Sequence, residues 1–173
     1  LVGSEMCIRD RLYVGHARDG MSIVDINTRT VRNITPDPAH PHGLPGNSIR
    51  AMHKDQFGNI WLATNQGLAL YNPQKDSFFT FRNDPRNPNS LGSNSIFSIE
   101  AMADGTLWIG TDMAGISILN LNDLTLHNPE QIEFRHISAT EQRNSLSSVN
   151  VKSIFQDAFQ NVWVGNYRMG IDC

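Results

Sequence analysis

The chain has 173 residues, a formal net charge of −3 at pH 7, 39% hydrophobic residues and 18% charged residues. It is long enough to bury a sizeable core, and its small net charge gives no electrostatic reason to expect nucleic acid or a membrane surface as a partner. No run of about 18 apolar residues is present, so the sequence predicts no transmembrane helix.

Residues 1–11 do not fit the pattern of the remaining chain, because charged residues such as Glu5 and Arg9 stand where other units have an apolar strand. The segment also lacks the apolar core and cleavage pattern of a signal peptide. It is similar to the foreign ends of translated environmental fragments. We therefore expect residues 1–11 to be a non-native or disordered end and the domain to span 12–173.

The other end stops at Cys173, a few residues into an expected strand, so the sequence looks cut at both ends. The two cysteines, Cys7 and Cys173, both lie in these end segments. They predict no disulfide framework and carry no information about the cellular compartment.

Between the ends the chain repeats itself, and the residue spacings define the repeat. A leucine precedes a tryptophan by 17 residues three times, in the pairs Leu44 and Trp61, Leu91 and Trp108, and Leu146 and Trp163. Tyr13 takes the place of the tryptophan in a first unit. The units are predicted to span about 12–46, 47–93, 94–148 and 149–173.

Each unit reads as short strands separated by turns. In chain order the expected strands are Leu12–Gly15, Met21–Ile26, Val31–Ile34, Ser48–Lys54, Ile60–Thr64, Leu68–Tyr71, Phe78–Arg82, Ile96–Met102, Leu107–Thr111, Ile116–Leu121, Gln131–Ile137, Val149–Phe155 and Val162–Gly165. A period of about 40 to 50 residues with several strands per unit is typical of propeller blades. The predicted fold is all-β, a partial β-propeller of four-stranded antiparallel blades, about three blades plus incomplete ends.

The second strand of the second unit, residues 60–63, is apolar at every position, which predicts burial from both faces. A blade between two others meets this condition, with the tryptophan filling the space between neighbours. Glycines open the third strands. The residues expected to define the structural repeat are Tyr13, Trp61, Trp108, Trp163, Gly20, Gly67, Gly115 and Gly170.

The turns between first and second strands are typical of hairpins, with Asp104-Gly105 as the strongest signal. In the last unit Gln160 replaces the glycine, so a different turn is expected there. The connectors between units are rich in proline, asparagine and serine and are predicted to be loops.

Catalytic signatures are missing from the sequence. It contains no nucleophile elbow, no phosphate-binding glycine loop and no dinucleotide fingerprint. The Asp104-Gly105-Thr106 segment with Trp108 fits the Asp-box of sialidases poorly, because the tryptophan lies one residue too far away. His40-Pro41-His42 has no third ligand at close spacing. We therefore predict no catalytic residue, no metal site and no cofactor.

In an antiparallel four-stranded blade, the loop between the second and third strands emerges on the same side as the connector between blades. Loops held by a rigid scaffold are where binding residues concentrate. This side is the candidate ligand or partner surface. Its candidate residues are His16, Arg18, Asn65, Gln66, Asp112, Tyr167 and Arg168.

Three stretches carry a family resemblance: DQFGNIWLAT at 55–64, GTLWIGT at 105–111 and VWVG at 162–165. They resemble the two-component regulator propeller repeat, whose pattern is roughly D-x-x-G-x-[IL]-W-[IV]-G-T-x-x-G-[IL]. The connector NSLGSNSI at 89–96, echoed by NSLSS at 144–148, is similar to the sequence that joins blades in this family. Ala63, Met102, Gln160 and Asn166 depart from the pattern without disturbing the period.

The resemblance implies an extracytoplasmic, periplasmic sensor module of a hybrid two-component histidine kinase of Bacteroidetes type. Such a module would sense oligosaccharides and form a homodimer, and the parent would be anchored in the inner membrane by segments absent here. The resemblance implies no catalysis in this chain and no nucleic-acid binding by it. The alternatives are a propeller enzyme, either a lyase or a glycosidase, and a protein-interaction scaffold.

Overall fold

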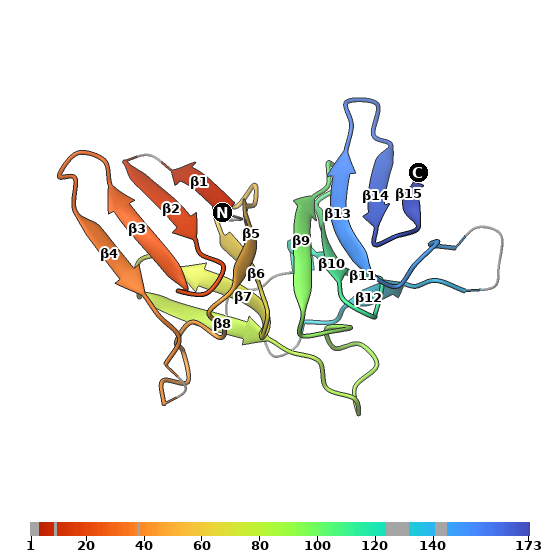
Figure 1. Ribbon diagram of the computed structural model, residues 1–173, viewed down its shortest axis with the longest axis horizontal. Helices are drawn as coiled ribbons and strands as arrows, with labels where there is room; N and C mark the ends of the chain where they lie inside the picture. Colours follow the sequence, from red (N-terminus) through yellow and green to blue (C-terminus); the bar gives the residue numbers. More distant parts are fainter. Residues whose placement is uncertain (1–3, 9, 38, 124–131, 141–144) are drawn as a thin grey trace.

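A computed structural model describes all residues except 1–3, 9, 38, 124–131 and 141–144. The described residues form fifteen β-strands and one short 3-10 helix, η1 (Leu121–Asp123). The strands form four antiparallel sheets that follow one another around an open arc (Figure 1). The structure is therefore the predicted all-β partial propeller.

Three sheets have four strands and the last described sheet has three, each in sequential order. The first contains β1 (Ser4–Ile8), β2 (Arg11–Gly15), β3 (Met21–Asp25) and β4 (Val31–Ile34). The second contains β5 (Ile49–Lys54), β6 (Ile60–Thr64), β7 (Gly67–Asn72) and β8 (Ser77–Phe81). The third contains β9 (Ile96–Ala101), β10 (Thr106–Thr111), β11 (Ile116–Asn120) and β12 (Arg135–Ile137). The fourth contains β13 (Val151–Gln156), β14 (Val162–Asn166) and β15 (Gly170–Asp172).

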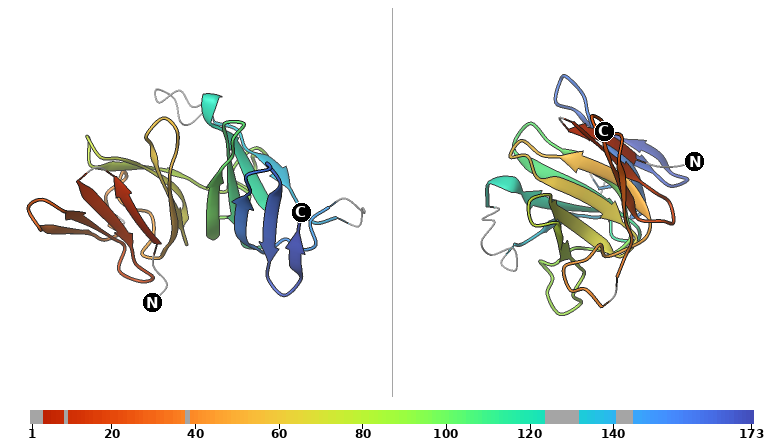
Figure 2. Two further views of the ribbon diagram at one scale, coloured as in Figure 1. Left: turned by 90° about the horizontal axis from the view of Figure 1, so that it is seen from above. Right: turned by 90° about the vertical axis from the view of Figure 1, so that its left-hand side faces the viewer.

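The first strands of the sheets lie together on the inner side of the arc, and the later strands lie further out (Figures 1 and 2). Strand β5 neighbours β1 on one side and β9 on the other, and β9 in turn neighbours β13. This is the radial arrangement of propeller blades around a common axis. In the described part of the chain, no helix has the length and apolar character needed to cross a membrane.

The structure differs from the sequence-based expectation at the N-terminal end. Residues 4–8, which we expected to lie outside the domain, form β1 and pair with β2 from Ser4 opposite Gly15 to Ile8 opposite Arg11. Met6 and Ile8 also pack against the core between the first two sheets. The free edge of β2 offers backbone donors and acceptors to any extended segment, so the charged residues nearby do not prevent pairing.

The outer strand of the third sheet is shorter than predicted. Strand β12 covers Arg135–Ile137, whereas the sequence predicted residues 131–137. The enlarged loop expected around 126–130 lies outside the described residues. Phe134, just before β12, is buried in the core between the second and third sheets.

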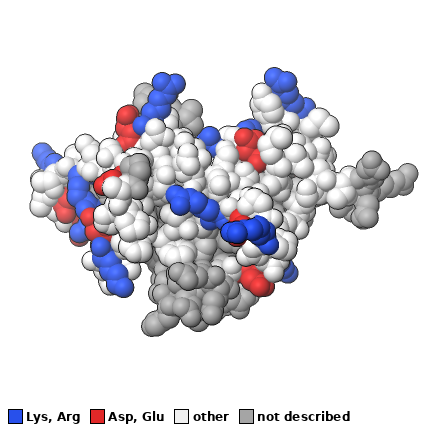
Figure 3. Space-filling view, turned by 90° about the horizontal axis from the view of Figure 1, so that it is seen from below, with Lys and Arg blue, Asp and Glu red and all other residues white. Residues whose placement is uncertain are grey.

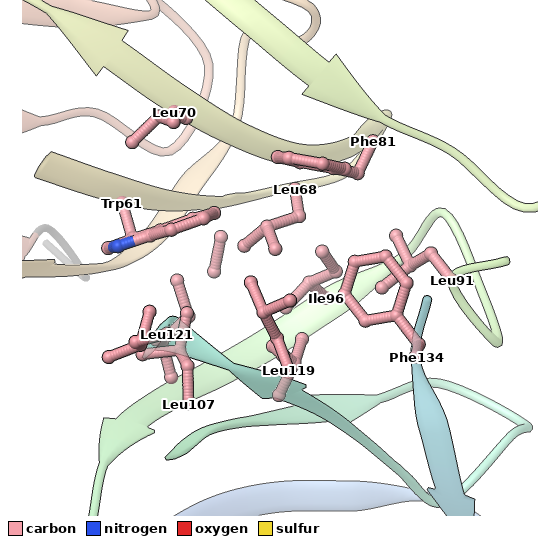
Figure 4. Close-up of a cluster of buried hydrophobic side chains, with 13 residues drawn as sticks. Trp61, Leu68, Leu70, Phe81, Leu91, Ile96, Leu107, Leu119, Leu121 and Phe134 are labelled. Atoms are coloured by element: carbon pink, nitrogen blue, oxygen red, sulfur yellow. The ribbon is translucent and has the colours of Figure 1, made fainter. Parts of the chain in front are cut away.

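The core is divided among the spaces between neighbouring sheets. Strand β6 is buried along its whole length, as the sequence predicted. Ile60 and Leu62 point to the first sheet, whereas Trp61 and Ala63 point to the third. Figure 4 shows the core between the second and third sheets, where Trp61 lies with Leu107 and Phe81.

The three tryptophans hold the same strand position but differ in burial. Trp61 is 0% exposed and Trp163 is 42% exposed, and Trp108 lies between these values. The indoles lie on equivalent faces of their sheets, and in the second and third sheets this face packs against the next sheet in the chain. The prediction of tryptophans packed between blades is confirmed for Trp61 and is only partly met at Trp163, because no described sheet covers that face.

An aspartate organises the turn beside two of the tryptophans. The buried Asp55 carboxylate accepts hydrogen bonds from the backbone N–H groups of Phe57 and Asn59 and from Nε1 of Trp61, the last at 2.8 Å. Asp157 does the same in the fourth sheet, with Trp163 Nε1 at 3.0 Å. The Asp-x-x-Gly-x-x-Trp spacing is thus a structural device of the blade.

In the third sheet a different group accepts the hydrogen bond of the tryptophan N–H, because Met102 stands at the position of the aspartate. Trp108 Nε1 donates to Thr106 Oγ1 at 3.0 Å, and that hydroxyl donates to Asp104 at 2.6 Å. The substitution therefore leaves the indole N–H paired.

The prediction of a different turn at Gln160 was wrong. Gln160 adopts a φ of +69°, in the same left-handed region as Gly58 at +86° and Gly105 at +85°. Its backbone N–H donates to the Asp157 carbonyl, as the N–H of Gly58 donates to Asp55. The flanking hydrogen bonds hold the turn in shape although glutamine is strained there.

The glycines that open the third strands are required by space as well as by φ. A Cβ atom at Gly20 would lie 2.3 Å from the carbonyl oxygen of Ile34 in the neighbouring strand. Equivalent clashes occur at Gly67 and Gly115, with Phe81 and Ile137. Gly170 shares the positive φ of this group.

Candidate functional site

The loops between second and third strands lie on the same side of the arc as the connectors between sheets, the lower side in Figure 1. We call this side the loop face; it comprises residues 16–20, 65–67, 112–115 and 167–170 with the connectors next to them. Each loop is fastened to a connector by backbone hydrogen bonds of 2.8–2.9 Å: Gly20 to Asn47, Gly67 to Asn94, Gly115 to Val149 and Tyr167 to Asn150. The scaffold therefore holds these loops in place.

In the first half of the loop face, the candidate residues have different roles. His16 is half-buried, and its Nε2 lies 2.7 Å from Ser22 Oγ, which donates to Asn33. Arg18 is exposed at the tip of its loop. His16 thus belongs to a hydrogen-bonded network within the first sheet, whereas Arg18 is open to solvent.

Asn65 and Gln66 line a hollow beside the first connector. Asn65 Oδ1 accepts from the Ser48 N–H at 3.3 Å, and its Nδ2 donates to Asn47 at 3.3 Å. The hollow has a volume of about 730 Å³ and is also lined by His40 and Arg82. The Asn65 and Gln66 amides therefore stand at the wall of an open groove.

In the second half, the loops of the third and fourth sheets converge on Asn150. The N–H of Met113 donates to Asn150 Oδ1 at 3.0 Å, and the N–H of Tyr167 donates to its carbonyl at 2.9 Å. The Arg168 guanidinium lies 4.9 Å from the centre of the Tyr167 ring. The structure thus brings Tyr167 and Arg168 into contact, in a loop bonded to the same connector as the loop of Asp112.

Three further residues join this group, and the sequence analysis did not single them out. Arg50, Phe97 and Lys152 lie in the first strands β5, β9 and β13, each six positions after the repeated leucine of its unit. That shared position was visible in the sequence. Its meaning was not, because it depends on how the first strand pairs with the second.

Each of the three is the extra residue of a β-bulge. Ile49 pairs with Thr64 and Ala51 pairs with Ala63, so Arg50 has no opposite residue. The register shifts in the same way around Phe97 and around Lys152. A bulge redirects the side chain of its extra residue, and bulges are common beside functional sites.

The bulge residues form a row with Tyr167 and Arg168. The Arg50 guanidinium lies 4.3 Å from the centre of the Phe97 ring, and Lys152 Nζ lies 3.0 Å from the same centre. Lys152 Nζ is also 5.2 Å from the centre of the Tyr167 ring. We call Arg50, Phe97, Lys152, Tyr167 and Arg168 the cation–aromatic row; in it, cations and rings alternate across three sheets.

The wider loop face carries little charge. Seen from below in Figure 3, it is mostly uncharged, with Lys and Arg groups and Asp and Glu groups scattered over it. His40 and His42 are exposed on the first connector. Within the described residues, no group of three or more His, Cys, Asp or Glu side chains is placed to hold a metal ion.

The family comparison finds the two-component regulator propeller in two segments, residues 43–66 and 145–168. These segments contain the connector, the first two strands and the following loop of the second and fourth sheets. The repeat predicted from the sequence is therefore confirmed. A search of curated proteins gave no significant match.

Solved structures with the same fold include two extracellular domains of hybrid two-component systems of B. thetaiotaomicron. This chain is 35% identical to the BT3049 domain over 95% of the length of this chain, at a TM-score of 0.72. With BT4673 the identity is 24% over 98% of its length, at a TM-score of 0.78. The chain spans only 18% and 23% of those two extracellular domains.

A third structure shows the fold alone. The computationally designed protein Ika4 shares 13% identity with the chain, at a TM-score of 0.60. The match covers 98% of this chain and 87% of Ika4.

Proposed function

We propose that this chain, which carries repeats of the two-component regulator propeller family, is part of the sensor region of a hybrid two-component system and recognises an oligosaccharide through its loop face. The observation that carries the proposal is the likeness to the BT3049 extracellular domain, in sequence and in fold, over nearly the whole chain. The same likeness supports an extracytoplasmic location, and the proposal places the chain in the periplasm.

The chemistry of the loop face suits a sugar. The Asn65 and Gln66 amides offer donors and acceptors to hydroxyl groups, beside a groove of about 730 Å³. Tyr167 presents an exposed ring on which the apolar face of a sugar can stack. Both features stand on loops that backbone hydrogen bonds fix to the scaffold, so little ordering cost accompanies binding.

The chain would contribute recognition and homodimer contacts to a larger parent protein. Propellers of this family in sensor regions are generally non-catalytic, so the proposal assigns no reaction to this chain. The parent would be anchored in the inner membrane and carry the histidine kinase. A sugar that binds one conformation of the dimer more tightly would shift its equilibrium and so transmit the signal.

The test is a glycan array on the chain, followed by titration calorimetry with the glycans that bind. We expect the double variant Asn65→Ala/Gln66→Ala and the single variant Tyr167→Ala to weaken binding about tenfold or more, since each removes contacts with the sugar. Gln56→Ala is the matched control, because Gln56 is exposed in the turn between β5 and β6, at the other end of the sheet. If no glycan binds, or if the loop-face variants bind as the wild type does, the proposal is wrong.

A further inference from the structure

Two exposed phenylalanines stand on the side of the sheets opposite the loop face. Phe57 is 58% exposed and Phe159 is 87% exposed. Each lies two positions after the aspartate that organises its turn, so the second and fourth sheets present a ring at the same place. The turn between β13 and β14 protrudes at the top of Figure 1. We call this side the turn side; it comprises the turns at 55–59, 72–77, 102–105 and 157–161.

The turns fix the position of these rings without requiring them. The N–H of Phe57 donates to Asp55 Oδ1 at 3.0 Å, and the N–H of Phe159 donates to Asp157 Oδ1 at 2.9 Å. Any residue with a backbone N–H can make this contact, and Asp104 holds the equivalent position in the third sheet. Because the ring positions are fixed in advance, little conformational entropy is lost when a partner covers them.

A partly apolar hollow of about 530 Å³ lies beside Phe57. It is formed by the β5–β6 turn, by the β7–β8 turn and by Leu70 and Phe79 beneath them. Pro73 also lines it. The second sheet therefore offers a hollow on the turn side, and the fourth sheet offers a protruding ring on the same side.

The order of the sheets makes this side complementary to itself. The second sheet packs on one face of the third and the fourth sheet packs on the other, so the hollow and the ring of Phe159 lie on opposite sides of the third sheet. A two-fold axis that lies in the plane of the turn side, along the third sheet, places the fourth sheet of each copy over the second sheet of the other. Each copy then inserts one ring and receives one, and the contact closes at two chains.

Charge favours the same pairing. Lys75 lines the hollow, and Lys54 lies against Gly58 at its edge. Asp157 stands in the turn that carries the protruding ring. Cations of the second sheet therefore meet an anion of the fourth. The two Asp104 side chains approach each other near the axis, which opposes the contact, so the dimer is expected to be weak.

We propose that the turn side is a self-association surface, on which Phe159 of one copy enters the hollow beside Phe57 of a second copy and the reverse contact completes a two-fold dimer. A second copy suits this surface because the chain itself supplies both the ring and the hollow. The inference specifies where the homodimer contact of the proposed function lies, and in that role it rests on the proposed function.

Sedimentation velocity on the full 173-residue chain tests the dimer. The background carries Phe155→Lys/Ile171→Lys, which places charge on the uncovered face of the fourth sheet and so suppresses association through that face. In this background we expect a dissociation constant of about 1–100 μM. Phe159→Ser should raise it about tenfold or more, because it removes the aromatic anchor. Ile26→Ser is the matched control, since Ile26 is exposed beside the β3–β4 turn of the first sheet, outside the proposed contact.

Cross-linking tests the orientation of the two copies. In the same background with Cys7→Ser/Cys173→Ser, one chain carries Ala158→Cys, which keeps the neighbouring ring, and a second chain carries Lys75→Cys at the hollow. A short bismaleimide added to the mixture should join position 158 of one chain to position 75 of the other. Links between two copies of position 158 should be rare, because the two-fold axis keeps the fourth sheets apart.

Each outcome bears on one claim. A chain that stays monomeric in this background, a Phe159→Ser chain that dimerises as tightly as its parent, or a dominant link between two copies of position 158 would overturn the inference. Phe159→Leu keeps an apolar side chain and should retain most of the dimer, and thermal unfolding checks that both variants fold. Glycan binding by a chain that does not dimerise leaves sugar recognition standing and refutes this surface. The predicted cross-link without glycan binding supports the surface and refutes sugar recognition.

Discussion

At the scale of single residues, the buried Asp55 carboxylate is a polar group whose loss should lower stability clearly. It is buried and accepts from the Trp61 indole and from the turn that follows it. In Asp55→Ala the indole N–H and the turn donors lose their acceptor, so we expect a loss of about 2–3 kcal/mol in the free energy of unfolding. Urea denaturation followed by tryptophan fluorescence measures it.

Asp157→Ala provides the matched comparison, because Asp157 makes the same contacts to Trp163 at an exposed site. Water can replace those contacts, so the loss should be much smaller than for Asp55→Ala. Equal losses for the two variants would contradict the view that burial of the acceptor decides the cost.

Substitution of Gln160 is expected to raise the free energy of unfolding instead of lowering it. Gln160 holds a φ of +69°, where glycine occupies the equivalent turns of two other sheets. Gln160→Gly removes this strain, which exceeds the extra entropy that glycine loses on folding, so we expect a gain of about 0.5–1 kcal/mol. Gly58→Ala, the reverse change in the second sheet, should lose about 1 kcal/mol. A destabilised Gln160→Gly chain would show that the side chain makes a compensating contact.

At the scale of the elements, an outer clamp joins the first two sheets. Arg32 of β4 binds Asp76, which stands in the turn between β7 and β8, through both terminal nitrogens of its guanidinium, Nη1 and Nη2. The buried Tyr71 hydroxyl donates to the same carboxylate at 2.9 Å. Hydrogen bonds from Arg32 hold the pKa of Asp76 below its usual value, and burial raises the pKa of Tyr71 to about 12.

This clamp predicts a pH dependence. Because the pKa of Asp76 is lower in the folded chain than in the unfolded chain, its contribution is complete above pH 4 or so and is lost as the pH falls through the folded-state pKa. Asp76→Asn should therefore lower the urea midpoint at pH 7, and its difference from the wild type should shrink as the pH falls through the folded-state pKa of Asp76. Asp84→Asn is the control, because its ion pair with Arg86 is exposed and should contribute little. A constant difference between Asp76→Asn and wild type at all pH values would refute the assignment.

The sequence predicts those strands and turns that depend on the pattern of side chains, and it misses those that depend on backbone hydrogen bonds. The tryptophan spacing and the apolar run at 60–63 predicted the sheets and the two-sided burial of β6, because both are properties of side-chain pattern. The β1 strand was missed, because edge pairing uses backbone groups that the side chains do not reveal. The turn at Gln160 was mispredicted, because its other hydrogen bonds outweigh the preference of one residue.

The candidate site was predicted in part for a similar reason. Antiparallel topology placed the loops and connectors on one side, and the hydrogen bonds from Gly20 and Tyr167 to their connectors show this arrangement. Arg50, Phe97 and Lys152 were missed, because a bulge is set by strand register. The constant spacing of 17 residues between leucine and tryptophan gives no sign of the unmatched residue. Whether the loop-face residues bind a ligand stays a prediction.

At the scale of the whole molecule, the outer face of the last described sheet is apolar and uncovered. Phe155, Trp163 and Ile171 share this face and are 59%, 42% and 70% exposed. The equivalent face of the second sheet is buried against the third. We expect the isolated chain to self-associate through this surface, since sheet faces of this kind bury apolar area against a neighbour.

Sedimentation velocity over a range of concentrations measures this association. Phe155→Lys/Ile171→Lys should shift the chain toward monomer, because the two charges resist desolvation. Val31→Lys is the control, since Val31 is an exposed apolar residue of the first sheet. A wild-type chain that remains monomeric at every concentration would contradict the prediction.

The division of the core between neighbouring sheets also bears on how such proteins change in evolution. Each of β6 and β10 sends alternate side chains into two separate cores, so the described part of each sheet packs mainly against its immediate neighbours. A gene duplication that adds one whole unit therefore adds one more core between neighbouring sheets, of the same type as those already present. A deletion of half a unit instead leaves one apolar sheet face with no complete sheet to pack against. Lineages of these propellers should accordingly gain and lose blades as whole repeats, with the joints falling in the connectors.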